Sequence, residues 1–485
     1  MKMKVILISV DNHTLGIQTA ATVVAEEGGH PTLFYLPSHL PEYPPAIERK
    51  IMLAIQNIVG DESRFLIGFH LKELSSARAL QLAQAARREF GDRALLLAGG
   101  AYAMAMRGEL SSVFDHIVVG SAEGILPILS TTEEALPRVI QKSPSRFIYP
   151  SFPNAYLLNA DGEIVRGRRR PLAHPQYRHA HALEIMLEIG CSYACTFCEV
   201  AMLRGLFGPE YRILPSEPAR SIEIIRREIQ HSPEIDYLYF FDEDFLLKSQ
   251  KWIETFTDLY ADIRLPFFIF ATPRSVLRGR DKLRALARVG LDTVNVGVQT
   301  GSPRIARELF ERKEDREEVL KVLSTLTTLH REGLMTSPPM VDFVILNPYE
   351  TTADTVETFN LMRDMPLPFN AVMHCMSFFR GTPLYATATA EGVIPPDYRF
   401  QYDLHDSVSR IKRNEFRRDF TRGEERAWLR HNTLLSGMNG VHRIEKGKRL
   451  FGSLTNEDLL RYIDIDMPAE DIVRLAETLP NPMDC

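Results

Sequence analysis

Three cysteines within a short stretch constrain this chain more than any other feature of its sequence. Cys191, Cys195 and Cys198 follow an apolar run, residues 182–189, in a chain with only five cysteines. Cysteines this close along the chain are poorly placed to pair with one another, whereas thiolates that converge from a short loop can hold an iron–sulfur cluster. Three ligands would leave one iron of a cubane open to a small molecule.

A structural zinc site and a chance arrangement are the competing interpretations. Zinc would need a fourth Cys or His at a similarly short spacing. The next cysteine is Cys375, and no nearby histidine has zinc-finger spacing. The sequence therefore favours a cluster.

Length and composition exclude several classes of protein. A chain of 485 residues suggests two to four domains, and its net charge of −6 lacks the basic surplus expected for nucleic acid binding. No apolar run is long enough to span a membrane, and residues 4–10 are interpreted as a first strand rather than a signal peptide. Few cysteines fit a reducing compartment, so we expect a cytoplasmic protein.

Residues 1–140 alternate strand and helix signals. This alternation predicts an α/β fold, a Rossmann-like doubly wound domain whose ligand binds at the carboxyl ends of parallel strands. The expected strands are Lys4–Val10, Thr32–Tyr35, Phe65–Phe69, Ala94–Ala98 and His116–Val119. The candidate binding residues that follow them are Asp11, His13, Gly16, Gly99, Gly100, Gly120 and Glu123. At the Gly99-Gly100 pair, bare backbone would let a flat ligand approach closely.

Residues 141–181 are interrupted by prolines and are interpreted as a linker with one hairpin near Asp161-Gly162. A basic run, Arg166 and Arg168–Arg170, is either a solvated loop or a site for an acidic substrate or leader peptide.

Residues 182–390 repeat the strand–helix rhythm. The pattern predicts a partial (β/α)6 TIM-type barrel, whose chemistry lies at the carboxyl ends of the strands. The expected strands after the cysteines are Tyr237–Phe241, Phe267–Ala271, Thr293–Val298, Val341–Leu346 and Ala371–Phe378. Residues 391–485 are expected to form a small helical region that closes the barrel.

The cysteine spacing, with Phe197 just before the last cysteine, resembles the signature of the radical S-adenosylmethionine (SAM) family. The resemblance implies a [4Fe–4S] cluster on Cys191, Cys195 and Cys198 and cleavage of SAM to a 5′-deoxyadenosyl radical. It also implies that Asp242 and Asp244 contact the SAM amino group. Gln299 stands in a turn that resembles the Glu-x-Gly-Ser turn of the family, with an amide in place of the acid.

The N-terminal domain resembles the cobalamin-binding domain, through the pattern Asp11-x-His13-x-x-Gly16. His13 would either replace the lower cobalt ligand or line the pocket. The Ser-x-Leu element of that family is absent, because His70 and Leu71 stand there. A Rossmann-like domain without a ligand, or one that binds a partner, is the alternative. Two further segments, 347–351 and 380–385, match those of cobalamin-class radical SAM proteins.

Together these resemblances imply a cobalamin-dependent C-methyltransferase that acts on a peptide or natural-product intermediate and receives electrons from a donor such as flavodoxin or ferredoxin. A radical SAM peptide epimerase is the alternative, with Cys375 returning a hydrogen atom to the substrate radical. Another radical rearrangement or cyclisation, and a scaffold with a degenerate cluster, also stay open.

Cys375 lies on the last expected barrel strand. Because neighbours alternate sides, either Cys375 or His374 and Met376 face the interior. A buried packing role is the competing interpretation of this thiol.

Overall fold

The computed structural model describes residues 3–10, 15–37, 42–130, 136–150, 155–159, 161–167 and 181–394. Asp11, His13 and nearly all of the expected helical region at 391–485 lie outside this part of the chain. The chain divides into two compact units. The first holds residues 1–190, 199–236 and 379–381, and the second holds 191–198, 237–378 and the remainder from 382.

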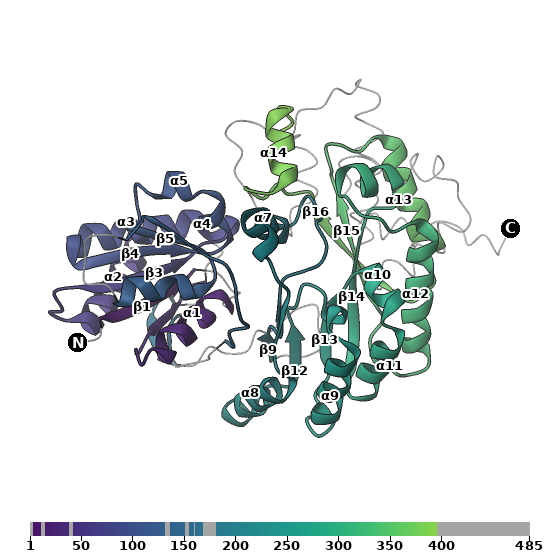
Figure 1. Ribbon diagram of the computed structural model, residues 1–485, viewed down its shortest axis with the longest axis horizontal. Helices are drawn as coiled ribbons and strands as arrows, with labels where there is room; N and C mark the ends of the chain where they lie inside the picture. Colours follow the sequence, from purple (N-terminus) through teal and green to yellow (C-terminus); the bar gives the residue numbers. More distant parts are fainter. Residues whose placement is uncertain are drawn as a thin grey trace. The chain divides into compact units, whose positions relative to one another are not determined.

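The first unit is built on a sheet in the order β6-β5-β4-β3-β1-β2-β7-β8, of which Figure 1 labels β1, β3, β4 and β5. All neighbouring strands pair in parallel except β7 and β8, which form an antiparallel hairpin. The strands are β1 (Lys4–Ser9), β2 (Thr32–Tyr35), β3 (Phe65–His70), β4 (Ala94–Gly99), β5 (His116–Gly120), β6 (Val139–Lys142), β7 (Ala155–Leu158) and β8 (Ile164–Gly167). The segment expected as a linker, residues 141–181, thus supplies β7, β8 and the end of β6, and β7 and β8 flank the Asp161-Gly162 turn.

Helices cover both faces of this sheet, as the alternation of strands and helices predicted. Alternate residues of each strand point to opposite faces, so Ile6 and Ile8 join one hydrophobic core and Val5 and Leu7 join another. The helices of the first core are α2 (Pro45–Val59), α3 (Ser76–Phe90), α4 (Ala101–Ala105) and α5 (Arg107–Leu110). The second core is closed by α1 (Leu15–Glu26) and α6 (Leu126–Ser130).

Later segments complete the first unit. They are β9 (Ala182–Ile185), β10 (Glu188–Ile189), α7 (Glu199–Phe207), β11 (Leu214–Pro215) and α8 (Pro218–His231). Helix α7 contributes Met202 to the core that α2 and α3 cover, so it is packed into this unit although it directly follows the cysteine segment.

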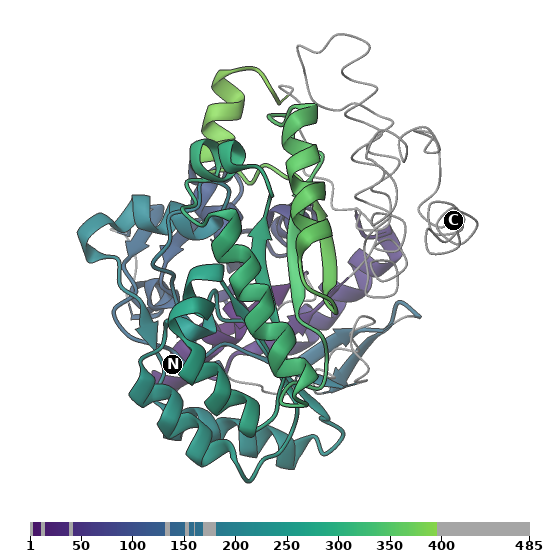
Figure 2. The ribbon, with the colours of Figure 1, turned by 90° about the vertical axis from the view of Figure 1, so that its right-hand side faces the viewer.

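The second unit contains five consecutive parallel strands, in the order β12-β13-β14-β15-β16. They are β12 (Tyr237–Phe240), β13 (Phe267–Ala271), β14 (Leu291–Gln299), β15 (Met340–Ile345) and β16 (Asn370–Cys375). The helices are α9 (Gln250–Tyr260), α10 (Pro273–Arg278), α11 (Arg280–Arg288), α12 (Arg316–Arg331), α13 (Thr352–Asp364) and α14 (Pro383–Ala390). Figure 2 shows the helices of this unit along one side of its strands.

One face of these strands packs against helices, and the opposite face forms the inner side of a partial barrel. Phe240 and Phe267 lie on the helix-covered face, where their rings contact Phe256 and Tyr260 of α9. The inner face carries the rings of Tyr239 and Phe268, stacked with centroids 4.4 Å apart. The α/β architecture predicted from the sequence is therefore confirmed. Among the helices that the structure describes, none is long and apolar enough to cross a membrane.

Candidate functional site

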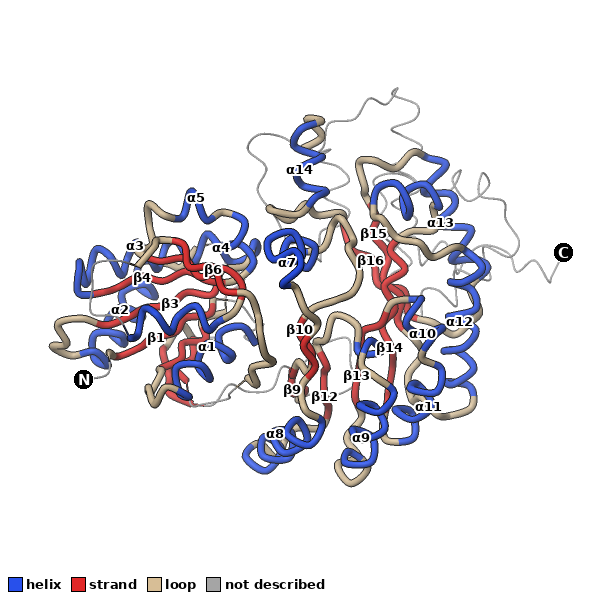
Figure 3. The backbone as a smooth tube through the Cα atoms, in the orientation of Figure 1, coloured by secondary structure: helices blue, strands red, loops and turns tan. Residues whose placement is uncertain are grey.

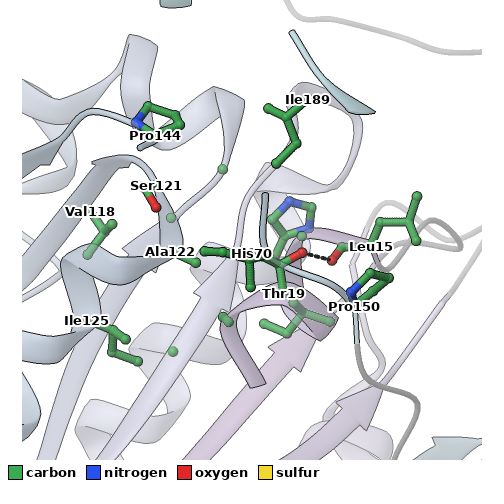
Figure 4. Close-up of a pocket in the computed structure, with 18 of the residues that line it drawn as sticks. Leu15, Thr19, His70, Val118, Ser121, Ala122, Ile125, Pro144, Pro150 and Ile189 are labelled. Atoms are coloured by element: carbon green, nitrogen blue, oxygen red, sulfur yellow. Dashed lines mark hydrogen bonds between the residues drawn. The ribbon is translucent and has the colours of Figure 1, made fainter. Parts of the chain in front are cut away.

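The first unit contains an apolar cavity of about 310 Å³ at the carboxyl ends of its central strands (Figure 4). Its walls come from the ends of β3, β4 and β5, the start of α1 and the segment after β6. The residues that carry these walls include Leu15, Gly16, Thr19, Gly68, His70, Gly99, Gly100, Gly120, Ser121, Ala122, Pro144 and Arg146. Four of the predicted glycines, Gly16, Gly99, Gly100 and Gly120, thus line one cavity, as expected for a doubly wound sheet.

The glycines that line this cavity differ in what a side chain at their position would contact. A Cβ at Gly100 would lie 2.5 Å from the Leu71 carbonyl oxygen, and its φ of +100° disfavours other residues. A Cβ at Gly120 would lie 2.3 Å from the Lys142 carbonyl oxygen. At Gly99, by contrast, the nearest atom is 3.9 Å away. Only the Gly99 position, of these three, leaves room that the protein itself does not use.

His70 is the imidazole that the structure places on the wall of this cavity. It ends β3, in register with Ser9 of β1 and Gly99 of β4. Its ring packs against Gly16, where an added Cβ would lie 2.7 Å from Nε2. Figure 4 shows it beside Thr19 and Leu15. Sequence reasoning placed His70 at the carboxyl end of the third expected strand and noted it as a departure from a family pattern, but did not assign it to the binding site. The position of His70 at a strand end was the signal that could have marked it.

Glu123 is held by ion pairing beside the cavity. Its carboxylate accepts a hydrogen bond from Arg146 at 2.8 Å, and Arg146 also pairs with Glu26 at 2.5 Å. Ser121 caps the short turn that carries Glu123, because its hydroxyl accepts from the Glu123 N–H. Glu123 therefore orients Arg146, which itself lines the cavity.

Cys191, Cys195 and Cys198 lie in an irregular loop of the second unit, residues 191–198, between β10 and α7 in the chain (Figure 3). The loop is anchored at Thr196. Its N–H donates to the Phe310 carbonyl oxygen at 3.4 Å, its hydroxyl donates to the Leu309 carbonyl, and its own carbonyl accepts from the Leu384 N–H at 3.0 Å. The Phe197 ring meets the Phe310 ring edge-on, with centroids 4.7 Å apart. Phe197 therefore packs the loop against the barrel.

Arg312 is the charged residue beside the cysteines that the sequence did not reveal. Its Nη1 lies 3.9 Å from the Cys195 sulfur, and its Nη2 donates to the Gly297 carbonyl oxygen at 2.7 Å. Burial raises the pKa of the Cys195 thiol, and the charge of Arg312 opposes that rise. Burial also raises the pKa of Cys191 to about 12. Once a metal ion has displaced the thiol proton of Cys195, the positive charge of Arg312 would stabilise the resulting thiolate.

Both predicted carboxylates of the acidic segment are fully buried and bonded within the unit. Asp242 pairs with Lys248 at 2.8 Å. Asp244 accepts from the Leu246 N–H at 3.1 Å and from the Thr272 hydroxyl at 2.8 Å. Burial raises the pKa of Asp244 although these hydrogen bonds act to lower it. Glu243, between them, is exposed.

The end of β14 offers polar groups on the inner face. Gln299 has a φ of +72°, and its amide lies over Gly297, where an added Cβ would be 2.6 Å from Nε2. Asn295 is buried, and its Oδ1 has no hydrogen-bond partner among the described residues. The Gln299 amide thus fills the space above Gly297, and the buried Asn295 acceptor is left unsatisfied within the described part of the chain.

Asn295 also belongs to a cluster of polar side chains on the inner face, with Asp342 and His374, that the sequence analysis did not predict. Its amide donates to both carboxylate oxygens of Asp342, at 3.1 and 3.0 Å, and His374 Nε2 lies 3.2 Å from Asp342 Oδ1. Burial lowers the pKa of His374, but the hydrogen bond and charge of Asp342 raise it more, so the net pKa is above its ordinary value.

Cys375 occupies the opposite side of its strand from His374. It pairs in register with Ile345, and alternation places it with Phe343 and Met373 on the helix-covered face. Its side chain is half-buried. The structure therefore brings His374, rather than Cys375, to the polar group of the inner face.

The three cysteine sulfurs supply the donor type that an iron–sulfur cluster requires, from one anchored loop. In the part of the chain that the structure describes, no three His, Cys, Asp or Glu side chains are already arranged around a common metal position. The donor set fits a cluster by its chemistry, and the glycine-lined cavity fits a flat apolar group because Gly99 leaves space there.

Comparisons with known proteins agree with this geometry. Residues 189–362 match the family model described as the Radical SAM superfamily. This part of the chain is a radical SAM domain. No curated protein matches the sequence.

Solved structures with a similar fold cover most of the chain. One is the radical SAM methyltransferase TsrM from Kitasatospora setae with cobalamin and a [4Fe–4S] cluster bound, at 13% identity and TM-score 0.58, covering 98% of this chain and 99% of that one. Another structure of TsrM, with tryptophan substrate and a SAM analogue, has 14% identity and TM-score 0.57, covering 81% and 77%. The cobalamin-dependent SAM radical enzyme OxsB with aqua-cobalamin has 12% identity and TM-score 0.61, covering 98% and 72%.

Asp354 joins the two segments that carry the expected family turns. It accepts from the Ser302 hydroxyl at 2.5 Å, from Arg304 at 2.6 Å and from the Thr351 N–H at 2.8 Å. Burial acts to raise its pKa, but the hydrogen bonds from Arg304, Ser302 and Thr351 outweigh burial and lower it. Asp354 thus fixes the turn after Gln299 against the start of α13.

We expect Asp354→Asn to lower the free energy of unfolding at pH 7 by about 1.5–3 kcal/mol, the value of hydrogen bonds to a buried charge. Because the folded pKa is lowered, the contribution of Asp354 is present above the ordinary aspartate pKa of about 4 and is lost as pH falls below it. The difference from wild type should therefore shrink toward pH 3. Urea unfolding at the two pH values measures it.

Asp364→Asn is the matched control, because Asp364 pairs with Arg316 at an exposed site. Its loss should stay under about 1 kcal/mol. A loss in Asp354→Asn that does not change with pH would contradict the role assigned to the charge.

Proposed function

We propose that this protein is a cobalamin-dependent radical SAM C-methyltransferase acting on a peptide or a small natural-product intermediate. The observation that carries the proposal is the pairing, in one chain, of a three-cysteine loop in a radical SAM domain with a glycine-lined cavity at the carboxyl edge of a doubly wound sheet. The fold that the chain shares with TsrM and OxsB, which bind cobalamin, supports the same reading.

When bound, the [4Fe–4S] cluster, SAM and cobalamin would supply the radical and methyl-transfer chemistry. Cys191, Cys195 and Cys198 would hold the cluster, and Arg312 would neutralise charge beside Cys195. Asn295 and Gln299 would bind SAM. The Asp342–His374 pair would orient a polar group of the substrate at the inner face. A protein electron donor would reduce the cluster.

The position of Cys375 supports methyl transfer over epimerisation. A thiol that quenches a substrate radical must reach the inner face, whereas alternation places Cys375 on the helix-covered face with Met373 and Phe343. A methyltransferase needs no such donor.

The cavity predicts a specific steric test of cobalamin binding. Wild-type protein reconstituted with cobalamin should show the corrin absorbance, and Gly99→Leu should lose it, because the new side chain enters space that only a ligand would use. The exposed Gly108, with no atom within 4 Å of an added Cβ, provides the control Gly108→Leu. Gly100 is unsuitable, since substitution there would collide with Leu71. Wild-type protein that lacks the corrin absorbance after reconstitution, or a Gly99→Leu variant that binds as much cobalamin as wild type, would count against cobalamin binding in this cavity.

The cluster is tested by replacing Cys191, Cys195 and Cys198 together by Ala. Iron content, brown absorbance and reductive cleavage of SAM should all disappear, because no other thiol lies in the loop. Cys375→Ala should keep all three. Cleavage of SAM by the triple variant would refute the assignment of these ligands.

Cys375→Ala also separates the two candidate reactions. For a methyltransferase the change removes packing volume worth about 1–2 kcal/mol of stability and leaves turnover largely intact. For an epimerase, 5′-deoxyadenosine would still form but the product would not. With substrate in deuterated water, a product heavier by one methyl group from both proteins supports methylation. A single deuterium in the wild-type product, lost in the variant, would establish epimerisation.

A further inference from the structure

The second unit has a cleft of about 880 Å³, to most of whose lining residues the proposed chemistry gives no role. One wall is the cysteine loop itself, residues 192–195. The other walls are α10, the start of α11, the turn that carries Arg307 and the segment 311–314. Asp242, Asp244 and Gln299, the residues expected to hold SAM, are not among those that line it.

The cleft is strongly basic. Its lining contains six cationic side chains and two carboxylates: Arg274, Arg278, Lys282, Arg307, Arg312 and Lys313 against Glu311 and Glu314. This excess of positive charge stands out in a chain whose net charge is −6. A concentration of one sign of charge in a concave surface raises the encounter rate with partners of the opposite sign.

Four of these six cations have no ion pair within the described ranges of the chain. Arg312 is used internally, by Glu314 at 3.5 Å and by Gly297, and Lys282 donates to the carbonyls of Leu246 and Lys248. The structure records no ion pair among its described residues for the side chains of Arg274, Arg278, Arg307 and Lys313. Three of these four, Arg278, Arg307 and Lys313, are exposed. Such charges remain available to an external partner.

The geometry points to a docking site for an acidic one-electron carrier protein of the flavin or iron–sulfur class. The inference rests on the proposed function, since it requires a cluster on Cys195. The charges come from four separate segments around a wide cleft, which suits the acidic face of a protein better than one small anion. Cys195 lies on the wall of the same cleft, so a carrier seated there is next to the electron acceptor.

The step at this site is a single electron transfer. The reduced carrier loses one electron and the cluster gains one, and no covalent bond forms or breaks. The basic rim therefore governs how often the carrier arrives, whereas the reactivity of the reduced cluster stays the same.

The test uses the full-length chain with its cluster reconstituted, and compares reduction by flavodoxin hydroquinone with reduction by dithionite. The variant Arg278→Glu/Arg307→Glu/Lys313→Glu should reduce with flavodoxin about tenfold more slowly at low salt than wild type. Its rate should also lose the decline with added salt that wild type shows. Reduction by dithionite, a small anion that needs no docking surface, should slow much less than reduction by flavodoxin. Stopped-flow loss of cluster absorbance measures all three quantities.

Lys251→Glu/Arg284→Glu/Arg288→Glu is the matched control, because it reverses three exposed charges of the same unit outside the cleft. It should behave as wild type. The variant Arg278→Lys/Arg307→Lys keeps both positive charges and should be reduced by flavodoxin at the wild-type rate. It tests the role of charge if the charge-reversed variant does not fold.

The outcomes separate this inference from the function on which it rests. An unchanged flavodoxin rate in the reversed variant, or an equal slowing with dithionite, overturns the docking site. If inorganic phosphate binds to the cleft with one-to-one stoichiometry, and flavodoxin reduction is inhibited only to the extent that phosphate is bound, the cleft is a small-anion site and the docking site is refuted. Wild-type protein that assembles no cluster refutes the proposed function instead.

Discussion

The loop that carries the three cysteines has no regular secondary structure, so its position depends on contacts supplied by the barrel. Thr196 is bonded to the carbonyls of Leu309 and Phe310, and Cys195 lies against the guanidinium of Arg312. Arg312 in turn holds the backbone at Gly297 on β14. One buried cation therefore connects the place where sulfur would meet metal with the place where Gln299 and Asn295 would meet SAM. A displacement of the cysteine loop would therefore also displace the end of β14, and the reverse.

Much of the architecture follows from hydrophobic patterning, because strands buried on both faces are continuous apolar runs. Residues 4–9 and 65–70 form β1 and β3 where those runs predict strands. The same signal failed for β8, whose residues are only partly buried, and for β6 among the prolines of its segment. Strand β8 pairs with β7 across the hairpin expected near Asp161-Gly162, and β6 pairs with β5. Local pattern did not place that hairpin in the sheet, because β7 pairs with β2, for example Ala155 with Leu33, which lies far away in the sequence.

The site divides in a similar way. Spacing identifies the cysteines, since their chemistry is encoded within eight residues. Arg312 could not be predicted, because its contact with Cys195 joins positions 117 residues apart. Alternation along the strand predicts that Cys375 and His374 point to opposite faces, but it does not say which of them faces the interior. The register of β16 with β15 and the hydrogen bond from His374 to Asp342 show that His374 does. Gly99 and Gly100 are adjacent in sequence, yet one leaves open space and the other packs against its own chain.

The anchoring of the cysteine loop also sets an order of events during synthesis. A ribosome releases the cysteines well before the carbonyls that hold Thr196, and Arg312 emerges 117 residues after Cys195. Until then the thiols belong to an untethered segment with no guanidinium beside them. The nascent chain thus passes through a period in which its thiols are exposed to oxidation. The loop therefore reaches its anchored position only after most of the barrel has been synthesised.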